Sequence, residues 1–188
     1  MSFDRGFKAH ANRVALEVRR DLNIDAVSPI CPWTLADSLC LPVIPLLSLA
    51  KESHSLARQV RYLAYRQPRV FSAMTVFHGA RRIIIHNDAH APVRQRSNLA
   101  HELAHALLMH PPHPPFCTDG SRIFDRRLEA EAGWLGAVLL VPNEAARWAM
   151  AHGKNERDAA HHFGVSVDLI RFRLRTSGAL RILDYSKS

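Results

Sequence analysis

The sequence predicts an α+β fold that is mainly helical, with a small antiparallel or mixed sheet and a C-terminal helical element of the helix-turn-helix kind. Three patterns predict it: amphipathic segments bounded by proline, two short runs rich in β-branched residues, and two short helical segments that meet at Gly164. With 188 residues, 47% of them hydrophobic, the chain can bury a core without disulfides. We therefore expect a single domain over residues 1–188, with a core at about residues 1–150 and a basic helical element at residues 151–188.

The first half of the chain combines two helices with two strands. The expected helices lie at residues 7–22 and 34–39, with a proline-marked turn at residues 28–32 between them, and the expected strands lie at residues 69–77 and 80–86. His78 and Gly79 join the strands, and three successive isoleucines give the second strand the pattern of a buried one. The segment between the second helix and the first strand is predicted to be irregular.

A central helix is predicted at residues 92–110. Pro92 fits a first helical turn, where its missing N–H leaves no hydrogen bond unmade, and Pro111 stops the helix. His101 and His105 are four residues apart, so their rings project from one face of this helix. An apolar stripe beside them indicates that the helix is buried on one side.

The His-Glu-Leu-Ala-His sequence of this helix has the spacing of a metal site. Two imidazoles on one face can bind one ion, and Glu102, beside the first of them, can take a proton from a water molecule there. A catalytic site of this kind needs a third protein ligand. The alternative is an amphipathic helix that carries surface histidines and binds nothing.

The third ligand is expected on a second helix, predicted at residues 127–142. Here Glu129 shares a face with Gly133 and Gly136, which weaken a helix and so indicate the close approach of a neighbouring one. That neighbour would be the histidine helix, which favours Glu129 as the ligand. Glu131 lies about 200° away around the helix axis, toward solvent or a basic neighbour. The alternative is that both acids are ordinary surface residues.

Over most of its length the chain resembles the ImmA/IrrE family of zinc metallopeptidases. The matching segments are the isoleucine strand at residues 82–87, a basic turn at residues 94–96, the His-Glu-Leu-Ala-His helix at residues 100–108, the Glu-x-x-Ala helix at residues 129–132, the Leu-Leu-Val-Pro segment at residues 139–142, and two N-terminal helices at residues 11–22 and 35–39. The chain departs from the family at Gly133, where Asn or Asp is usual, and at Ser97 and Asn98, where an aromatic residue and Thr are usual.

This resemblance implies a fold of the zincin type and a zinc-dependent metalloendopeptidase. It implies that His101, His105 and Glu129 bind Zn²⁺ and that Glu102 is the catalytic residue. It also implies a narrow substrate range: a helix-turn-helix transcriptional repressor is cleaved, which relieves repression of a stress response or a mobile element.

Two further segments are candidates for substrate contact. If the strand at residues 81–86 lies at a sheet edge, it could pair with an extended substrate backbone; an internal strand fits the sequence equally well. The proline-rich loop at residues 110–121, which contains His113, lies between the two helices of the metal site and either gates access or simply connects them.

The formal charge of +8 is concentrated partly near the C-terminus, which includes Arg171, Arg173, Arg175 and Arg181. Helices at residues 157–163 and 167–175, joined at Gly164 and capped by Ser166, resemble a helix-turn-helix, in which arginines would contact DNA phosphates. The family resemblance includes a similar element, which favours a helix pair packed on the catalytic domain or docking the substrate. Two alternatives to a peptidase remain. One is a DNA-binding transcriptional regulator with a structural or sensory zinc site, and the other is an interaction module of the toxin-antitoxin kind.

Cysteine usage and hydropathy predict a cytoplasmic protein without a membrane partner. The three cysteines have no spacing typical of a zinc knuckle or redox pair, and the longest apolar stretch, residues 41–50, is too short to span a membrane. Cys117 lies between the two helices of the metal site and is an alternative third ligand, as is Glu131, although a plain loop or core thiol is favoured.

Overall fold

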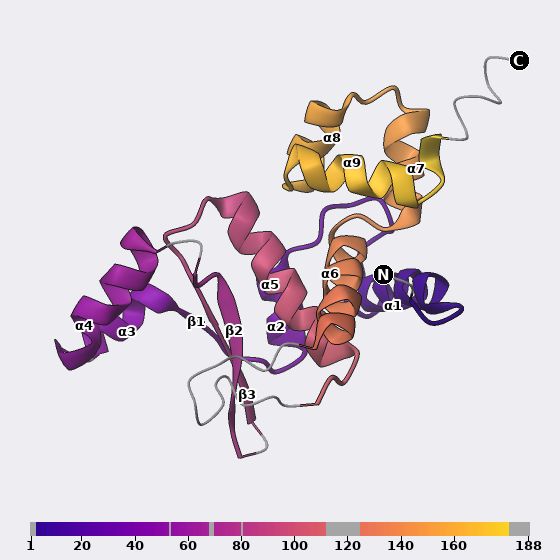
Figure 1. The fold of residues 1–188 in the computed structure, drawn as a ribbon. Helices are drawn as coiled ribbons and strands as arrows, with labels where there is room; N and C mark the ends of the chain where they lie inside the picture. Colours follow the sequence, from indigo (N-terminus) through magenta and orange to yellow (C-terminus); the bar gives the residue numbers. More distant parts are fainter. Residues whose placement is uncertain (1–2, 53, 68–69, 80, 112–124, 181–188) are drawn as a thin grey trace, which may run out of the picture.

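The computed structural model describes residues 3–52, 54–67, 70–79, 81–111 and 125–180 (Figure 1). Its helices are α1 (Phe7–Asp21), α2 (Pro32–Ser38), α3 (Leu46–Glu52), α4 (His54–Arg61), α5 (Pro92–Leu107), α6 (Arg126–Leu140), α7 (Asn143–Ala151), α8 (Glu156–Phe163) and α9 (Val167–Thr176). A π-helical turn, η1 (Tyr62–Arg66), follows α4, and the strands are β1 (Val43–Pro45), β2 (Ala73–His78) and β3 (Arg81–His86). The predicted α+β class, mainly helical with a small sheet, is confirmed.

The sheet has the order β1-β3-β2 and is mixed, because β3 pairs antiparallel with β2 and parallel with β1. Ile84 of β3 lies opposite Thr75 on one side and Val43 on the other. The strand at residues 81–86 is therefore internal and offers no edge to a substrate, which decides between the two alternatives that the sequence leaves open. Its second partner, β1, has only three residues and lies about 40 residues earlier in the chain. No local sequence pattern predicts this strand. Among the described strands, β1 and β2 form the edges.

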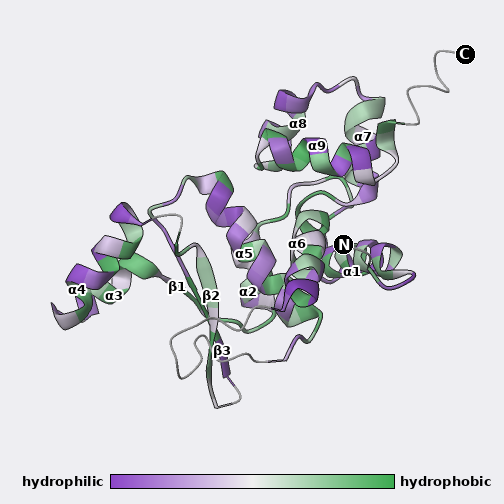
Figure 2. Ribbon diagram, in the orientation of Figure 1, coloured by the Kyte–Doolittle hydropathy of each residue, from purple (hydrophilic) through white to green (hydrophobic). Residues whose placement is uncertain are grey.

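Helices α5 and α6 pack against each other at the centre of the molecule, and α1 covers the other side of α6 (Figure 1). The side chains of Leu99, Leu103 and Leu135 are fully buried between these elements, and α6 is the most apolar of the three helices (Figure 2). A Cβ atom at Gly136 would lie 3.1 Å from the carbonyl oxygen of Ala100. The two helix backbones thus touch at Gly136, as the glycine pattern predicts, but not at Gly133, where the nearest atom to an added Cβ is Nδ1 of His101 at 4.0 Å.

Helix α5 ends three residues earlier than predicted. Met109 adopts a left-handed conformation with φ of 51°. Its N–H donates to the carbonyl oxygen of Ala106, and the N–H of His110 donates to that of His105. These two bonds form a Schellman motif, which ends the helix and turns the chain back along it.

Helices α3 and α4 replace the irregular segment that the sequence predicts. They cover one end of the sheet around a small core formed by Leu46, Val60, Ala64 and Phe71 (Figure 1). Pro42 and Pro45 interrupt the apolar stretch from which α3 and β1 are built, and this interruption obscured both elements. No helix in the described part of the chain is long and apolar enough to cross a membrane.

The C-terminal pair α8 and α9 forms as predicted. Gly164 takes the left-handed conformation with φ of 63°, and the Ser166 hydroxyl accepts a hydrogen bond from the N–H of Leu169. The pair packs on the rest of the molecule, where the Arg173 guanidinium donates to the carbonyl oxygen of Val141. The structure thus places these helices against the core.

Candidate metal centre

Three side chains from α5 and α6 converge on one point. The Nε2 atoms of His101 and His105 lie 3.1 Å apart. The carboxylate oxygens of Glu129 lie 3.2 Å from Nε2 of His101 and 3.5 Å from Nε2 of His105. The helix contact at Gly136 explains this placement, because it brings the start of α6 against the end of α5 that bears the histidines. The structure therefore brings together the three residues that the sequence proposes as ligands.

This donor set fits a metal ion. One nitrogen from each ring and one carboxylate oxygen all lie within 4.8 Å of one another. The side chains keep part of their surface in solvent, with 30% of His101, 19% of His105 and 36% of Glu129 exposed. Two imidazoles and one carboxylate are the three protein ligands of many catalytic metal sites, in which a further position stays open to water or substrate.

Electrostatics within the cluster follow from this packing. Burial lowers the pKa of His101, but the carboxylates of Glu129 and Glu102 outweigh it, so this pKa is raised above 6.5. The hydrogen bond to His101 holds the pKa of Glu129 below 4.5, against the opposing effect of burial. Glu129 is therefore present as a carboxylate at neutral pH, the form that binds a cation.

Glu102, the predicted catalytic residue, lies beside this cluster and faces the sheet. One carboxylate oxygen accepts a hydrogen bond of 2.7 Å from the Thr75 hydroxyl on β2. Burial raises the pKa of Glu102 above 4.5, although this hydrogen bond and His101 work in the opposite direction. The sequence does not identify Thr75, because its contact depends on how β2 packs across α5.

Glu131 does not join the cluster. Its side chain is only 10% exposed, so it does not face solvent, but it does have the basic neighbour that the helix geometry suggests: Arg127 donates to it at 3.0 Å. Its other carboxylate oxygen lies 3.3 Å from Nε2 of His110. Burial lowers the pKa of His110 below 6.5, although Glu131 opposes this shift. His110 is a site residue that sequence reasoning missed.

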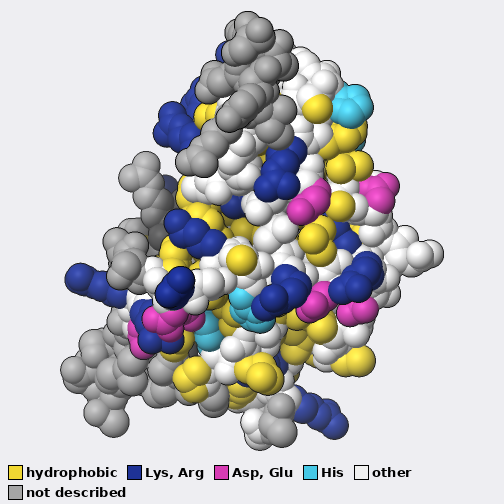
Figure 3. All heavy atoms as spheres, turned by 90° about the vertical axis from the view of Figure 1, so that its right-hand side faces the viewer, with side chains coloured by type: hydrophobic (Ala, Val, Ile, Leu, Met, Phe, Trp, Pro, Cys, Tyr) yellow, Lys and Arg dark blue, Asp and Glu magenta, His cyan; other side chains and the backbone are white. Residues whose placement is uncertain are grey.

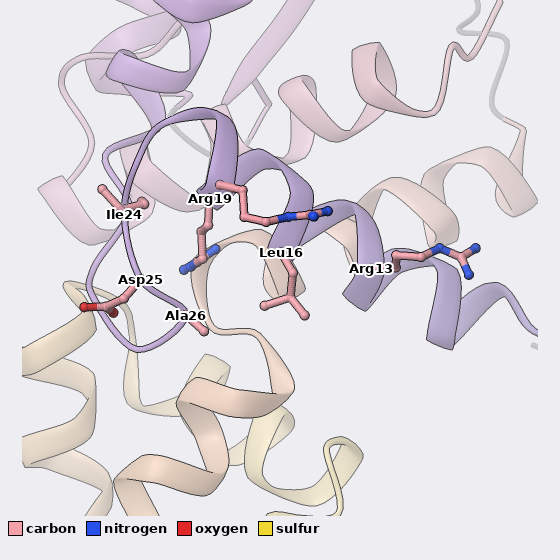
Figure 4. A pocket seen from close by; sticks show the side chains of 7 residues that line it. Arg13, Leu16, Arg19, Ile24, Asp25 and Ala26 are labelled. Carbon is pink, nitrogen blue, oxygen red and sulfur yellow. The ribbon is translucent and has the colours of Figure 1, made fainter.

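Cys117 and His113, which the sequence offers as a ligand and as part of a loop over the site, lie outside the described residues. The described part of the chain also has a pocket elsewhere, at the end of α1 (Figure 4). It is lined by Arg13, Leu16, Arg19, Arg20, Ile24, Asp25 and Ala26. Arg19 has a structural partner there, because its guanidinium donates to the carbonyl oxygen of Leu139 at 2.6 Å.

The basic side chains do not gather into one patch on the face shown in Figure 3, where lysines and arginines are spread among acidic residues. Arg171 of α9 pairs with Glu156 and Asp168. Arg173 is 1% exposed, and burial lowers its pKa to about 10, so it stays charged at neutral pH. Of the arginines considered for phosphate contacts, Arg173 thus faces the interior and Arg175 is exposed. Arg181 lies outside the described residues.

Comparison with known proteins identifies the family. The family model described as the IrrE N-terminal-like domain, a peptidase family, matches residues 50–175. This match covers both helices of the metal centre and most of the C-terminal pair, and it confirms the resemblance noted in the sequence. No curated protein and no solved structure shows a significant match to the chain.

Proposed function

Since this chain belongs to the ImmA/IrrE family of metallopeptidases, we propose that it is a zinc-dependent metalloendopeptidase. His101, His105 and Glu129 hold Zn²⁺, and Glu102 is the catalytic residue. The observation that carries the proposal is the convergence of the three ligand atoms within 4.8 Å of one another, beside a fourth residue suited to proton transfer.

The ligand chemistry supports zinc. Neutral imidazoles together with a carboxylate suit Zn²⁺ better than Mg²⁺ or Ca²⁺, which prefer a shell of oxygen ligands. When bound at such a site, zinc lowers the pKa of water toward neutrality and polarises a carbonyl group. All three side chains keep part of their surface exposed, as a metal site open to water and substrate requires.

Glu102 supplies the proton transfers. Its carboxylate takes a proton from the attacking water and returns it to the departing amine as the peptide bond breaks. The raised pKa makes it a stronger base than an exposed glutamate. The Thr75 hydroxyl donates to one oxygen of the carboxylate and so holds this side chain beside the three ligands.

Strand β2 is the element best placed to align a substrate. It is an edge strand among those described, and Thr75 within it contacts Glu102. An extended peptide that adds to its outer edge would run beside α5, where main-chain hydrogen bonds fix its direction. This assigns to β2 the role that the sequence had suggested for residues 81–86.

The substrate that we propose is a helix-turn-helix transcriptional repressor, cleaved in the cytoplasm to relieve repression of a stress response or a mobile element. Support comes from the family and from the net charge of +8, which favours an acidic repressor or one bound to DNA.

The test is cleavage of purified helix-turn-helix repressors from the same genome by the zinc-loaded full chain. We expect the wild type to cut one of them at a discrete site, a chelator to abolish the cut and added zinc to restore it. Glu102→Gln is the inert control. If the zinc-loaded wild type cuts no repressor, the substrate is wrong; if Glu102→Gln cuts as well as the wild type, the catalytic assignment is wrong.

A DNA-binding regulator is the second candidate, because α8 and α9 meet at Gly164 as in a helix-turn-helix. The ion pairs of Arg171 and the burial of Arg173 count against it. Specific DNA retention that is lost when Arg171 and Arg175 are changed, together with a cellular phenotype indifferent to Glu102→Gln, would favour the regulator.

A further inference from the structure

A series of polar contacts leads from the metal centre through two buried side chains to an arginine at the surface. Nδ1 of His105, on the side of the ring away from the other ligands, lies 2.9 Å from Nδ1 of His110. Nε2 of His110 lies 3.3 Å from Oε2 of Glu131, and Oε1 of Glu131 accepts a hydrogen bond from Arg127. The side chains of His110 and Glu131 are 6% and 10% exposed.

The backbone places His110 for this contact. The Schellman motif ends α5 at Leu107 and bonds the N–H of His110 to the carbonyl oxygen of His105. The turn at Met109, with φ of 51°, brings the ring of His110 back against the ring of His105, with centroids 4.9 Å apart. His110 is therefore held from both its backbone and its side chain.

With His110 neutral, one placement of the protons satisfies the contacts between Glu131, His110 and His105. The carboxylate of Glu131 can only accept, so Nε2 of His110 carries a hydrogen and donates it. A neutral His110 then has a lone pair on Nδ1, which can only accept, so Nδ1 of His105 carries the next hydrogen. The lone pair of His105 is left on Nε2, the nitrogen that faces the other two ligands.

We propose that His110 and Glu131 are positioning residues, which hold the imidazole of His105 in the tautomer that can bind a metal ion. The proposal rests on the function proposed above only for the identity of the metal. It assigns to Glu131 a role behind the site, because a hydrogen bond to the far nitrogen of a metal-binding histidine fixes its tautomer and its orientation.

His101 has no such support from α6. Its Nδ1 faces Gly133, where an added Cβ atom would lie 4.0 Å away. Glycine offers no side chain to accept a hydrogen bond, and this residue is exposed. The two histidines thus differ: one is backed by a buried pair of side chains, and the other by a glycine at the surface.

The first measurement is the affinity of the full chain for zinc, by competition with a chelating dye. His110→Phe fills the site with a ring but removes the acceptor, and we expect it to weaken zinc binding about 10- to 100-fold. His110→Asn keeps an acceptor oxygen near the place of Nδ1, and we expect it to restore most of the affinity. His86→Phe removes another buried histidine, at the end of β3, and is expected to leave zinc affinity unchanged.

The second measurement is the tautomer of His105 in the metal-free protein, from two-bond couplings in nitrogen-15 NMR. We expect the Nδ1–H form in the wild type and in His110→Asn, and a mixture in His110→Phe. This reading requires neither zinc nor activity, so it separates a failure of this proposal from a failure of the proposed function.

Three results would overturn the proposal. They are an Nε2–H tautomer of His105 in the metal-free wild type, unchanged zinc affinity in His110→Phe, and equal losses of affinity in the Phe and Asn variants, which would reduce His110 to a packing role. Circular dichroism of the metal-free variants checks their folding. If His110→Phe does not fold, the wild-type tautomer and His110→Asn still decide the question.

Discussion

Helices α5 and α6 differ from helices α8 and α9 in how they use charged side chains. In the first pair, His101, His105 and Glu129 turn toward one another at a partly exposed opening. In the second pair, Arg173 turns inward and donates to the main chain at Val141, and Arg171 is neutralised by acids on the same two helices. One pair converges on a position for a ligand, and the other uses its charges to hold itself together.

This difference shows what a basic composition can and cannot indicate. The C-terminal arginines resemble a nucleic-acid surface when they are counted, but a buried guanidinium with three hydrogen-bond partners stabilises a fold. The histidines and acids of the metal centre are few, yet their mutual distances point to chemistry. Variants of the two regions should therefore have separable effects.

The largest effect is expected at the metal centre. Glu102→Gln removes the proton acceptor and should lower kcat by about 10²- to 10⁴-fold. Zinc content and melting temperature should stay close to the wild type, because the variant keeps the side chain's shape. Steady-state cleavage assays measure the loss, with Glu17→Gln, at an exposed position of α1, as the matched control. Full activity in Glu102→Gln would contradict the role of Glu102 as the catalytic residue, and with it the claim that α5 and α6 carry the chemistry.

The converse effect is expected in the C-terminal pair. Arg173→Met leaves the carbonyl oxygen of Val141 and the Asn143 side chain without their buried donor, and should cost about 3 kcal/mol of unfolding free energy. Urea titrations measure this cost. Arg175→Met, at an exposed position, should change stability by less than about 0.5 kcal/mol. Zinc bound per folded chain should be unchanged in both, and a loss in Arg173→Met alone would mean that the two regions are coupled.

The contact between α5 and α6 gives a matched pair of smaller effects. Gly136→Ala places a methyl group 3.1 Å from the backbone at Ala100 and should cost about 1–3 kcal/mol, with weaker zinc binding. Gly133→Ala has room for the methyl group and gains helix propensity of up to about 1 kcal/mol. Thermal unfolding of the two variants compares them. Equal destabilisation would contradict the close approach at Gly136.

The smallest effect concerns pH. Burial lowers the pKa of His86 and of His110 below 6.5, so each of these two side chains binds a proton more readily in the unfolded chain than in the folded one. These two neutral histidines make their full contribution to the free energy of unfolding above pH 6.5. The contribution is lost as the pH falls from 6.5 toward their lowered pKa values in the folded state. Urea unfolding of the metal-free chain over this range measures the slope, which His86→Phe should reduce. His101, whose pKa is raised, acts in the opposite direction in both proteins, so the difference between them isolates His86. A slope that His86→Phe leaves unchanged would contradict the burial effect on this ring.

Local patterns account for much of the fold and the site. The spacing of His101 and His105 and the face shared by Glu129 and Gly136 need only helix geometry, and the structure brings these residues together. Gly164 and Ser166 mark the C-terminal turn because their conformational and capping preferences are strong.

The features that were missed depend on partners distant in sequence or on an unusual backbone. β1 has three residues and is defined by its pairing with β3, which also makes β3 internal. The turn that places His110 has Met109, rather than glycine, in the left-handed conformation, so no residue at this position signals that the helix stops early. The burial of Arg173 follows from contacts with the segment after α6, which a count of charges does not show.

The most direct test of the metal centre is the zinc content of the purified wild type beside Glu129→Ala, measured by mass spectrometry. We predict about one zinc per chain in the wild type and a clear loss in the variant, because a catalytic site of this kind has three protein ligands. Full retention of zinc in Glu129→Ala would contradict the three-ligand site and would move the third ligand to Glu131 or Cys117. No zinc in either protein would contradict the zinc peptidase itself.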